Sequence, residues 1–281
     1  RGIIQRYTQE WRKTISRIGR WVDFDNDYKT MDTWYMESVW WVVQQLWNKD
    51  LIYRGEKVVP FSTALGTVLS NFEAGSNYQE TQDPAVTVLF KLCEEQDTFI
   101  AAWTTTPWTL PSNLALCVGD DITYSKVRDE TLGVHIIIAS DRLPHYEDQK
   151  SLTVVETFLG AELVGKTYDP PFPYFLDERA NGAFQVVSDD YVSTDSGTGI
   201  VHQAPAFGED DLRVLKQAGI DALVCPIDMQ GCFTDAVTDF AGQHVKEADK
   251  AIIRALKASG ALYVQEVIQH SYPFCPRSDT P

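Results

Sequence analysis

The chain has 281 residues, 44% of them hydrophobic, which suffices for one large domain or for one domain with a smaller lobe. Its formal net charge of −16 argues against broad, non-specific binding to nucleic acid, which depends on many lysine and arginine contacts to phosphates. No apolar run is long enough to span a bilayer, and the first residues resemble neither a signal peptide nor a transit peptide, so we expect a cytoplasmic protein without a membrane partner.

Residues 1–74 are helix-prone and rich in tryptophan. Asp32 can cap a helix that runs from residue 33 to about residue 49. One face of this helix is apolar at helical spacing, with Tyr35, Val39, Val42 and Leu46. The remaining surface carries Trp34, Trp41 and Trp47. This is more aromatic surface than a single helix can hide, and two interpretations stay open: burial within this chain, or burial against a domain outside it.

From about residue 75 to residue 267 the pattern changes to short β-rich runs separated by turns. The expected strands are Val86–Leu92, Phe99–Trp103, Thr123–Val127, His135–Ala139, Leu152–Glu156, Ala183–Val187 and Gly199–His202. Strands at this spacing predict a barrel-like sheet. Helices predicted over 210–218 and 245–258 make the fold class α+β. We therefore divide the chain into a helical flank (1–74), a β-rich domain (75–270) and a return segment (271–281).

A run of threonines follows the second of these predicted strands. Thr104, Thr105 and Thr106 come directly before Pro107, which ends the strand because proline cannot donate to a β-ladder and restricts the residue before it. The segment continues through Trp108, Thr109 and Asn113. Three hydroxyl groups are therefore expected together at a strand end, and the alternative is an exposed sheet edge with a proline-rich turn.

A second distinctive run spans residues 195–211. Gly197 and Gly199 allow a close approach of the backbone to another group, and the short strand after them ends at His202. A helix then begins with three acids, the last of which is Asp211. Such acids commonly just complement the helix dipole. A carboxylate beyond a kinked glycine–proline loop can also hold a cationic group.

Together the two runs resemble the signature peptides of the editing domain of isoleucyl-tRNA synthetases. The segments 19–25 and 70–73 are similar to the eukaryotic cytosolic type of that enzyme, and the resemblance covers essentially the whole chain. Valyl and leucyl enzymes share the Gly-Thr-Gly and the final aspartate, but they usually have Arg-Pro after the threonines and no histidine at the position of His202. The resemblance implies a barrel-like, β-rich editing domain with flanking helices.

The activity implied by the resemblance is the hydrolytic deacylation of valyl-tRNA(Ile) without a protein nucleophile, as part of a class I isoleucine–tRNA ligase. Valine lacks one methylene of isoleucine, worth only about 1–3 kcal/mol in an apolar pocket, a general value of which isoleucyl enzymes are themselves the standard example. A second, hydrolytic site removes the resulting errors. Two alternatives stay open: a module that binds the aminoacyl-adenosine end of tRNA but is inactive in isolation, and a structural fragment that contacts another domain.

The resemblance also assigns roles to individual residues. The implied catalytic residues are Thr104, Thr105, Thr106 and Asp211, where the threonines contact the terminal adenosine and orient a water and the aspartate holds the α-ammonium of the substrate. The implied substrate-binding residues are Trp108, Thr109, Asn113, His202 and again Asp211. A fixed anion for the ammonium and hydrogen-bond donors for the ester are what this chemistry requires.

Other motifs of such synthetases are missing. The His-Ile-Gly-His and Lys-Met-Ser-Lys-Ser sequences of the amino-acid-activating site do not occur, and no glycine-rich phosphate loop is present, so the chain is not expected to activate isoleucine or to require a cofactor. Where some relatives bind zinc with paired cysteines, Cys275 is followed by Ser278 in place of a second cysteine, and residues 60–66 contain none. One thiolate cannot form a tetrahedral site, so no metal is predicted.

The expected partners are the 3′ end of tRNA(Ile) with its aminoacyl ester and the remaining domains of the synthetase, and we expect a monomer. The acidic charge is compatible with a tRNA-handling role if other domains hold the body of the tRNA and this module receives only the flexible end.

Overall fold

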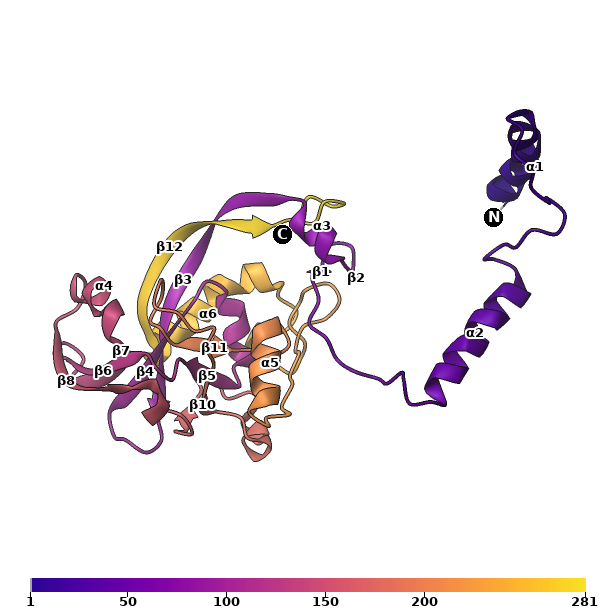
Figure 1. Cartoon of the computed structure of the whole chain (residues 1–281). Coiled ribbons are helices and arrows are strands. Elements are labelled where there is room, and N and C mark those ends of the chain that lie inside the picture. Colours follow the sequence, from indigo (N-terminus) through magenta and orange to yellow (C-terminus); the bar gives the residue numbers. More distant parts are fainter. Residues whose placement is uncertain (1) are drawn as a thin grey trace. The chain divides into compact units, whose positions relative to one another are not determined.

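The structure, a computed structural model, describes residues 2–281 and divides by its internal contacts into two units, Arg1–Glu56 and Lys57–Pro281 (Figure 1). The division lies earlier than the residue 74 proposed from the sequence. Thr63 is one reason, since its hydroxyl lies 3.4 Å from Nε2 of His244 in the second unit. The assignment of residues 1–74 to the side of another domain stays a prediction.

The first unit consists of two helices, α1 (Gly2–Arg17) and α2 (Thr33–Trp47). Helix α2 begins directly after Asp32, as predicted, but the Asp32 side chain makes no capping hydrogen bond. No side chain within Thr33–Trp47 is buried. The exposed fractions of Trp34, Trp41 and Trp47 are 54%, 60% and 58%. The first unit by itself therefore does not bury the tryptophans, and both interpretations of what covers them stay open.

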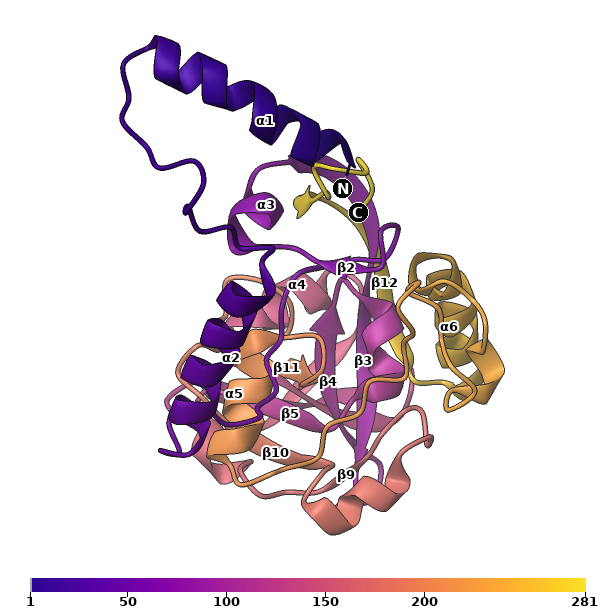
Figure 2. The ribbon, with the colours of Figure 1, turned by 90° about the vertical axis from the view of Figure 1, so that its right-hand side faces the viewer.

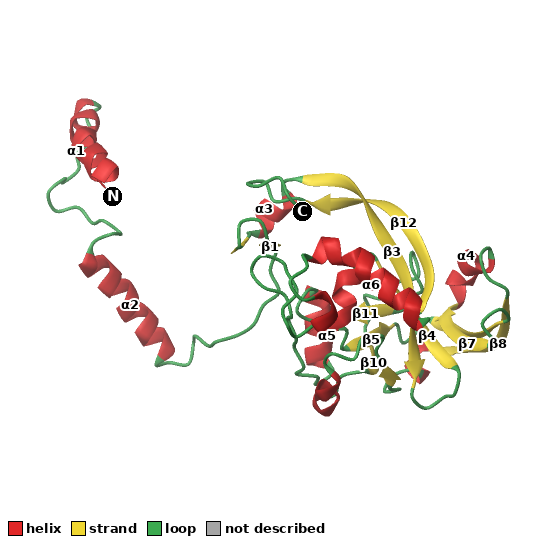
Figure 3. Cartoon of the chain, turned by 180° about the vertical axis from the view of Figure 1, so that it is seen from behind, coloured by secondary structure: helices red, strands yellow, loops and turns green. Residues whose placement is uncertain are grey.

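The second unit is built on a ten-stranded mixed sheet (Figure 3). The order of its main path is β10-β5-β11-β4-β7-β6-β8, and β3 adds to β4 and also pairs with β9 and β12. The strands are β3 (Tyr78–Leu92), β4 (Thr98–Thr104), β5 (Ala115–Val118), β6 (Thr123–Asp129), β7 (Val134–Ala139), β8 (Leu152–Leu159), β9 (Tyr168–Asp169), β10 (Gln185–Ser188), β11 (Val201–Gln203) and β12 (Leu262–Pro273). This sheet forms a half-barrel with flanking helices, which confirms the predicted α+β class.

Short elements complete the second unit. The helices are α3 (Asn71–Gly75), α4 (Leu143–Glu147), α5 (Glu209–Gln217) and α6 (Val245–Ser259), and a small hairpin joins β1 (Phe61–Ser62) and β2 (Thr67–Val68). The 3₁₀ segments are η1 (Pro107–Ser112), η2 (Ser140–Arg142), η3 (Gly160–Glu162), η4 (Leu176–Asn181) and η5 (Thr238–Phe240). Helices α5 and α6 lie where 210–218 and 245–258 were predicted to be helical.

The main core lies between the sheet and helix α6, whose apolar face buries Ala248, Ile252 and Leu256 completely. Ile252 and Leu256 stand four residues apart and therefore on one side of the helix. Gly260 ends α6 in the left-handed conformation, with φ +78°, which glycine adopts without steric cost. Helix α6 also packs on η1, and so supports the segment that follows the threonines (Figure 2).

Strand β12 was not predicted as a strand. It pairs with β3 along a long ribbon, from Leu262 opposite Val88 to Pro273 opposite Tyr78, and it crosses the predicted division at residue 270. Only Tyr263 and Val264, at its inner end, are buried, and from Gln265 onward its side chains are exposed or half-buried. A two-sided strand of this kind lacks the apolar run that marks the strands of a core.

Candidate functional site

Two parallel strands bring the distinctive runs of the sequence to one edge of the sheet. Strand β11 pairs with β4 through Val201 opposite Trp103. Parallel neighbouring strands end at the same edge of a sheet. The last residue of β4, Thr104, and the last residue of β11, Gln203, therefore lie at the same edge (Figure 2). The structure therefore places the threonine run and the run that leads to Asp211 next to each other.

The threonine segment folds on its own hydrogen bonds. The backbone N–H of Thr106 donates to Oγ1 of Thr104 at 3.1 Å, and Pro107 then begins η1. The Thr109 hydroxyl donates to the carbonyl of Thr106 at 2.8 Å, so threonine side chains satisfy the backbone of a turn that forms no ladder. The hydroxyl oxygens of Thr104 and Thr106 lie 3.1 Å apart, and those of Thr106 and Thr109 lie 3.3 Å apart.

Thr105 differs from its neighbours. Thr104 is 8% exposed and Thr109 is 6% exposed, whereas Thr105 and Thr106 are only partly buried. Among residues 2–281 no hydrogen bond is formed by the Thr105 hydroxyl, while the neighbouring hydroxyls are joined to one another. Thr105 is therefore the member of the run whose hydroxyl can meet a ligand without breaking an internal contact.

His202 lies behind the threonines and is held from both ring nitrogens. Its Nε2 is 2.8 Å from Oγ1 of Thr109, and its Nδ1 is 3.0 Å from the amide nitrogen of Asn113. Burial lowers the pKa of His202 to about 4, since a charged ring is disfavoured away from water. His202 is thus neutral at physiological pH. Asn113, 2% exposed, is part of the support of His202 and is not itself at the surface.

Asp211 is the third residue of α5 and reaches back to the loop before the helix. Its Oδ2 accepts a hydrogen bond from the backbone N–H of Ala204 at 2.7 Å, directly beyond β11. Burial raises the pKa of Asp211 to about 6. A Cβ at Gly208 would stand 2.6 Å from the Asp211 carboxylate, so a larger residue there would displace this carboxylate. The side chain is therefore not a simple helix-dipole partner, because it is turned toward the sheet edge.

An aromatic contact joins the two halves of the site. The Trp108 ring meets the Phe207 ring edge-on, with centroids 4.9 Å apart, which links η1 to the loop that carries Gly208. The Trp108 indole nitrogen is buried without a hydrogen-bond partner among residues 2–281. Helix α6, which packs on η1, carries the buried Asp249, whose Oδ1 has no hydrogen-bond partner among residues 2–281. Asp249 belongs to no recognisable motif, and Phe207 lies within the run 195–211 without a signal for this contact, so neither was expected from the sequence.

Gly197 and Gly199 serve the packing of the protein itself. Both have positive φ, +65° and +72°. A Cβ at Gly199 would stand 2.5 Å from the Cβ of Ala139, and one at Gly197 would stand 3.0 Å from the Cβ of Trp103. The close approach that the sequence indicated is therefore an approach to strands β7 and β4, which fixes the loop before His202.

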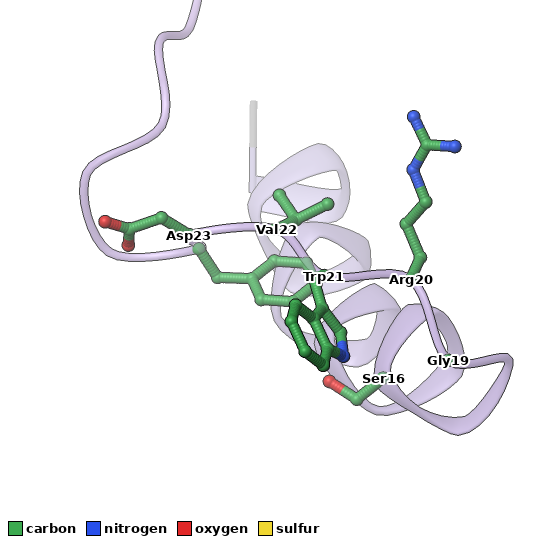
Figure 4. Close-up of a pocket in the computed structure, with 7 residues that line it drawn as sticks. Ser16, Gly19, Arg20, Trp21, Val22 and Asp23 are labelled. Carbon is green, nitrogen blue, oxygen red and sulfur yellow. The ribbon is translucent and has the colours of Figure 1, made fainter.

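A pocket in the first unit is distinct from the edge where β4 and β11 end. It has a volume of about 660 Å³ and surrounds Trp21, and the charged side chains that line it, Arg20 and Asp23, point away from one another (Figure 4). Trp21 is 98% exposed, so this is an open turn and not a binding site. Residues 2–281 contain no group of three or more His, Cys, Asp or Glu side chains placed to hold a metal ion. Within the same residues, no helix is long and apolar enough to cross a membrane.

Comparison with known proteins identifies the family. Residues 1–264 match the model of the class I tRNA synthetases for I, L, M and V. The isoleucine–tRNA ligase of Bdellovibrio bacteriovorus is 56% identical over the whole chain, and the cytoplasmic isoleucine–tRNA ligase of Mus musculus is 54% identical over the whole chain. The chain spans 27% and 23% of the length of these two relatives, about a quarter of each.

A solved structure matches the fold. GlLeuRS-CP1 aligns with 65% of this chain and 98% of its own length at a TM-score of 0.52 and 16% sequence identity. This neighbour is an editing domain of a leucyl-tRNA synthetase. At such low identity the match speaks for the fold alone, and it agrees with the half-barrel described above.

Proposed function

Because this chain belongs to the class I tRNA synthetases for isoleucine, leucine, methionine and valine, we propose that its second unit hydrolyses valyl-tRNA(Ile) at the edge where β4 and β11 end. The substrate is an aminoacyl ester with an α-ammonium group. Asp211 supplies the anion for this ammonium, and the threonines supply hydroxyl groups for the terminal adenosine and for the attacking water. One observation carries the proposal: the threonine run and the loop whose Ala204 N–H holds the partly buried Asp211 carboxylate leave the sheet at the same edge.

The geometry favours direct attack by water over a protein nucleophile. A histidine that activates a hydroxyl must accept its proton. Here Asn113 donates to Nδ1 of His202, which leaves the proton of the neutral ring on Nε2, and the Thr109 hydroxyl already donates to the Thr106 carbonyl at 2.8 Å. Thr109 is therefore an acceptor from His202 and not a nucleophile activated by it.

His202, Thr109 and Trp108 are proposed to shape the pocket for the side chain of the amino acid. A neutral histidine and two partly apolar side chains suit an aliphatic group, and exclusion of isoleucine needs only that one further methylene does not fit. Asn113 supports the adenosine region through His202 and not by contact, since it is buried.

The partners follow from the size and charge of the chain. It is part of a larger synthetase, and its net charge of −16 does not favour a grip on the tRNA body. We propose that this module receives the 3′ end of the tRNA while other domains hold the rest, in a monomeric cytoplasmic enzyme without a cofactor. The same facts favour a second candidate, a module that binds the aminoacyl-adenosine end but hydrolyses it only within the whole synthetase.

The experiment that tests these two functions compares the full chain with the whole synthetase. Each is mixed with valyl-tRNA(Ile) and with isoleucyl-tRNA(Ile), and the loss of the ester is followed over time. We expect both proteins to deacylate the valyl ester and to spare the isoleucyl ester. Activity of the synthetase alone, with binding of a non-hydrolysable valyl-adenosine by the chain, favours the binding module. Equal hydrolysis of the two esters, or of neither by either protein, contradicts the proposed function.

A further inference from the structure

A tyrosine of the core lies directly behind the site. Tyr168 in β9 is fully buried, and its ring packs edge-on against Phe90 and Phe184, with centroids 5.4 and 6.2 Å away. Its hydroxyl donates to Oδ1 of Asn113 at 2.7 Å. Burial raises the pKa of Tyr168 well above its usual value, so the hydroxyl keeps its proton and stays a donor.

The orientation of the Asn113 side chain is fixed by groups that have only one role. The carbonyl of Ala115, 2.9 Å from the amide nitrogen, can only accept a hydrogen bond. The amide nitrogen must therefore face Ala115, and the amide oxygen must face the tyrosine hydroxyl. The second proton of the amide nitrogen is then directed at Nδ1 of His202, 3.0 Å away.

The same logic passes through the histidine to the threonines. A neutral ring that accepts at Nδ1 carries its proton on Nε2, and this proton points at Oγ1 of Thr109, 2.8 Å away. The Thr109 hydroxyl is then left to donate to the carbonyl of Thr106, at 2.8 Å. Each hydrogen bond from the Tyr168 hydroxyl to the Thr109 hydroxyl thus determines the donor and acceptor of the next one. We call Tyr168, Asn113, His202 and Thr109 the polar chain.

We propose that Tyr168 is a positioning residue for ester hydrolysis, which together with the Ala115 carbonyl holds the Asn113 amide, keeps His202 in the Nε2–H tautomer and so sets the donor role of the Thr109 hydroxyl. The inference rests on the proposed function for its catalytic consequence, but the tautomer of His202 is a property of the protein alone. Tyr168 is fully buried and touches no substrate. It therefore acts only through the residues in front of it.

The test removes the hydroxyl and keeps the ring. In Tyr168→Phe the Asn113 oxygen loses its donor, the amide is less firmly held, and part of the His202 population is expected to carry its proton on Nδ1. Nitrogen-15 NMR of histidine-labelled full chain reports this tautomer directly. In deacylation of valyl-tRNA(Ile), kcat is expected to fall about three- to tenfold with KM changed less than about twofold, since alignment and not binding is lost.

Tyr146→Phe is the matched control. Tyr146 is also buried, 1% exposed, and its hydroxyl also has a side-chain partner, Oγ1 of Thr87 at 2.9 Å, but it lies in a second core cluster outside the polar chain. We expect a similar loss of thermal stability, an unchanged His202 spectrum and an unchanged kcat. Equal losses of kcat in the two variants would show that Tyr168 is merely structural. A wild-type His202 spectrum in Tyr168→Phe would overturn the inference whatever the activity.

A second variant tests the next link if Tyr168→Phe does not fold. In Asn113→Asp the carboxylate cannot donate to Nδ1, so His202 must take up a proton there, and its NMR titration must move above the wild-type pKa of about 4. An unchanged titration and tautomer would contradict the polar chain. If the wild-type protein shows the Nε2–H tautomer but no deacylation, the proposed function and the catalytic part of this inference fail, while the fixed tautomer stands.

Discussion

The two halves of the candidate site are built on opposite principles. On the threonine side, the polar side chains of Thr104, Thr106 and Thr109 are joined to one another and to a neutral His202. On the acid side, Asp211 makes one hydrogen bond, to the backbone of Ala204, and burial raises its pKa to about 6. These four side chains of the first half have hydrogen-bond partners without a substrate. The second half holds a charge that burial disfavours and that a bound cation would compensate.

This difference has a measurable consequence. Changes on the threonine side remove a partner from a buried polar group, and so they should lower the stability of the fold. Changes on the acid side remove a charge that burial disfavours, and so they should lower activity without lowering the stability of the fold. The following predictions test this division, from the largest expected effect to the smallest.

Asp211→Asn should cause the largest loss of activity. The amide keeps an oxygen that can accept from Ala204, but it cannot pair with the substrate ammonium, and loss of a charge-assisted contact costs about 1.5–3 kcal/mol, or about 10- to 100-fold in kcat/KM. The measurement is deacylation of valyl-tRNA(Ile), together with urea unfolding. Asp211→Ala should lose the same activity, but it also removes the Ala204 contact.

Asp210→Asn is the control for that substitution, because Asp210 occupies the same helical turn but is exposed and pairs with Arg213 at 3.1 Å. We expect it to edit like the wild type. If the Asp210 and Asp211 variants slow editing equally, the acidic turn acts through the helix dipole alone and Asp211 is not the ammonium anchor.

The pH dependence of editing should follow Asp211. Only the ionised carboxylate holds an ammonium, so kcat/KM should fall as pH drops through about 6 and should be about tenfold lower one pH unit below that value. Stability should change in the opposite sense: because the pKa is raised on folding, the contribution of Asp211 is fully present below its unfolded pKa and is lost as pH rises through about 6. Asp211→Asn should lack both inflections, and their persistence in this variant would assign them to another group.

Thr109→Val should lower stability more than a surface change does. The substitution removes the acceptor for the Nε2 proton of the buried His202, at a cost of about 1–3 kcal/mol in the free energy of unfolding. Thr109→Ser keeps the hydroxyl and should lose clearly less. Urea unfolding of the two variants decides the matter. Equal stability of Thr109→Val and the wild type would mean that the threonine side is not held by its internal hydrogen bonds.

Asp249→Asn should give the smallest effect, a gain in stability. Burial raises the pKa of Asp249 to about 7, so its protonated form is favoured by folding, and the stabilising contribution present at low pH is lost as pH rises through about 7. The amide removes this loss, and we expect a gain of about 1–2 kcal/mol at pH about 8 that disappears near pH 4. Thermal unfolding at the two pH values is the measurement. Asp148→Asn, at an exposed position, should show no such pH-dependent gain.

The sequence was sufficient for the residues with a local signature. The strand before Thr104 and the helix that begins near Asp211 were both predicted, because strand-forming residues before a proline and acids before an apolar helix face are local patterns. The roles of these residues in catalysis stay predictions. Their proximity could not be read from the sequence, because it depends on the pairing of Val201 with Trp103, a contact between residues far apart in the chain.

Other features lacked any local signal. Tyr168 belongs to no motif, and only the packing of β9 against Leu92 of β3 places its hydroxyl behind Asn113. Strand β12 mixes polar and apolar residues and has no buried side chain from Gln265 onward, so no apolar run marks it as part of a sheet. The position of the Asp211 carboxylate beside Gly208 likewise depends on the folded structure. The sequence indicates the kinked loop but not the direction of the side chain.

The ribbon of β3 and β12 has a mechanical consequence. Tyr78 stands opposite Pro273 at the outer end of the ribbon. A force that separates these two residues therefore breaks the hydrogen bonds between the strands one residue pair at a time, and not many of them at once. Such an opening stops where the strands enter the core near Val86. We therefore expect a displacement at the outer end to open the ribbon before it disturbs the threonine edge.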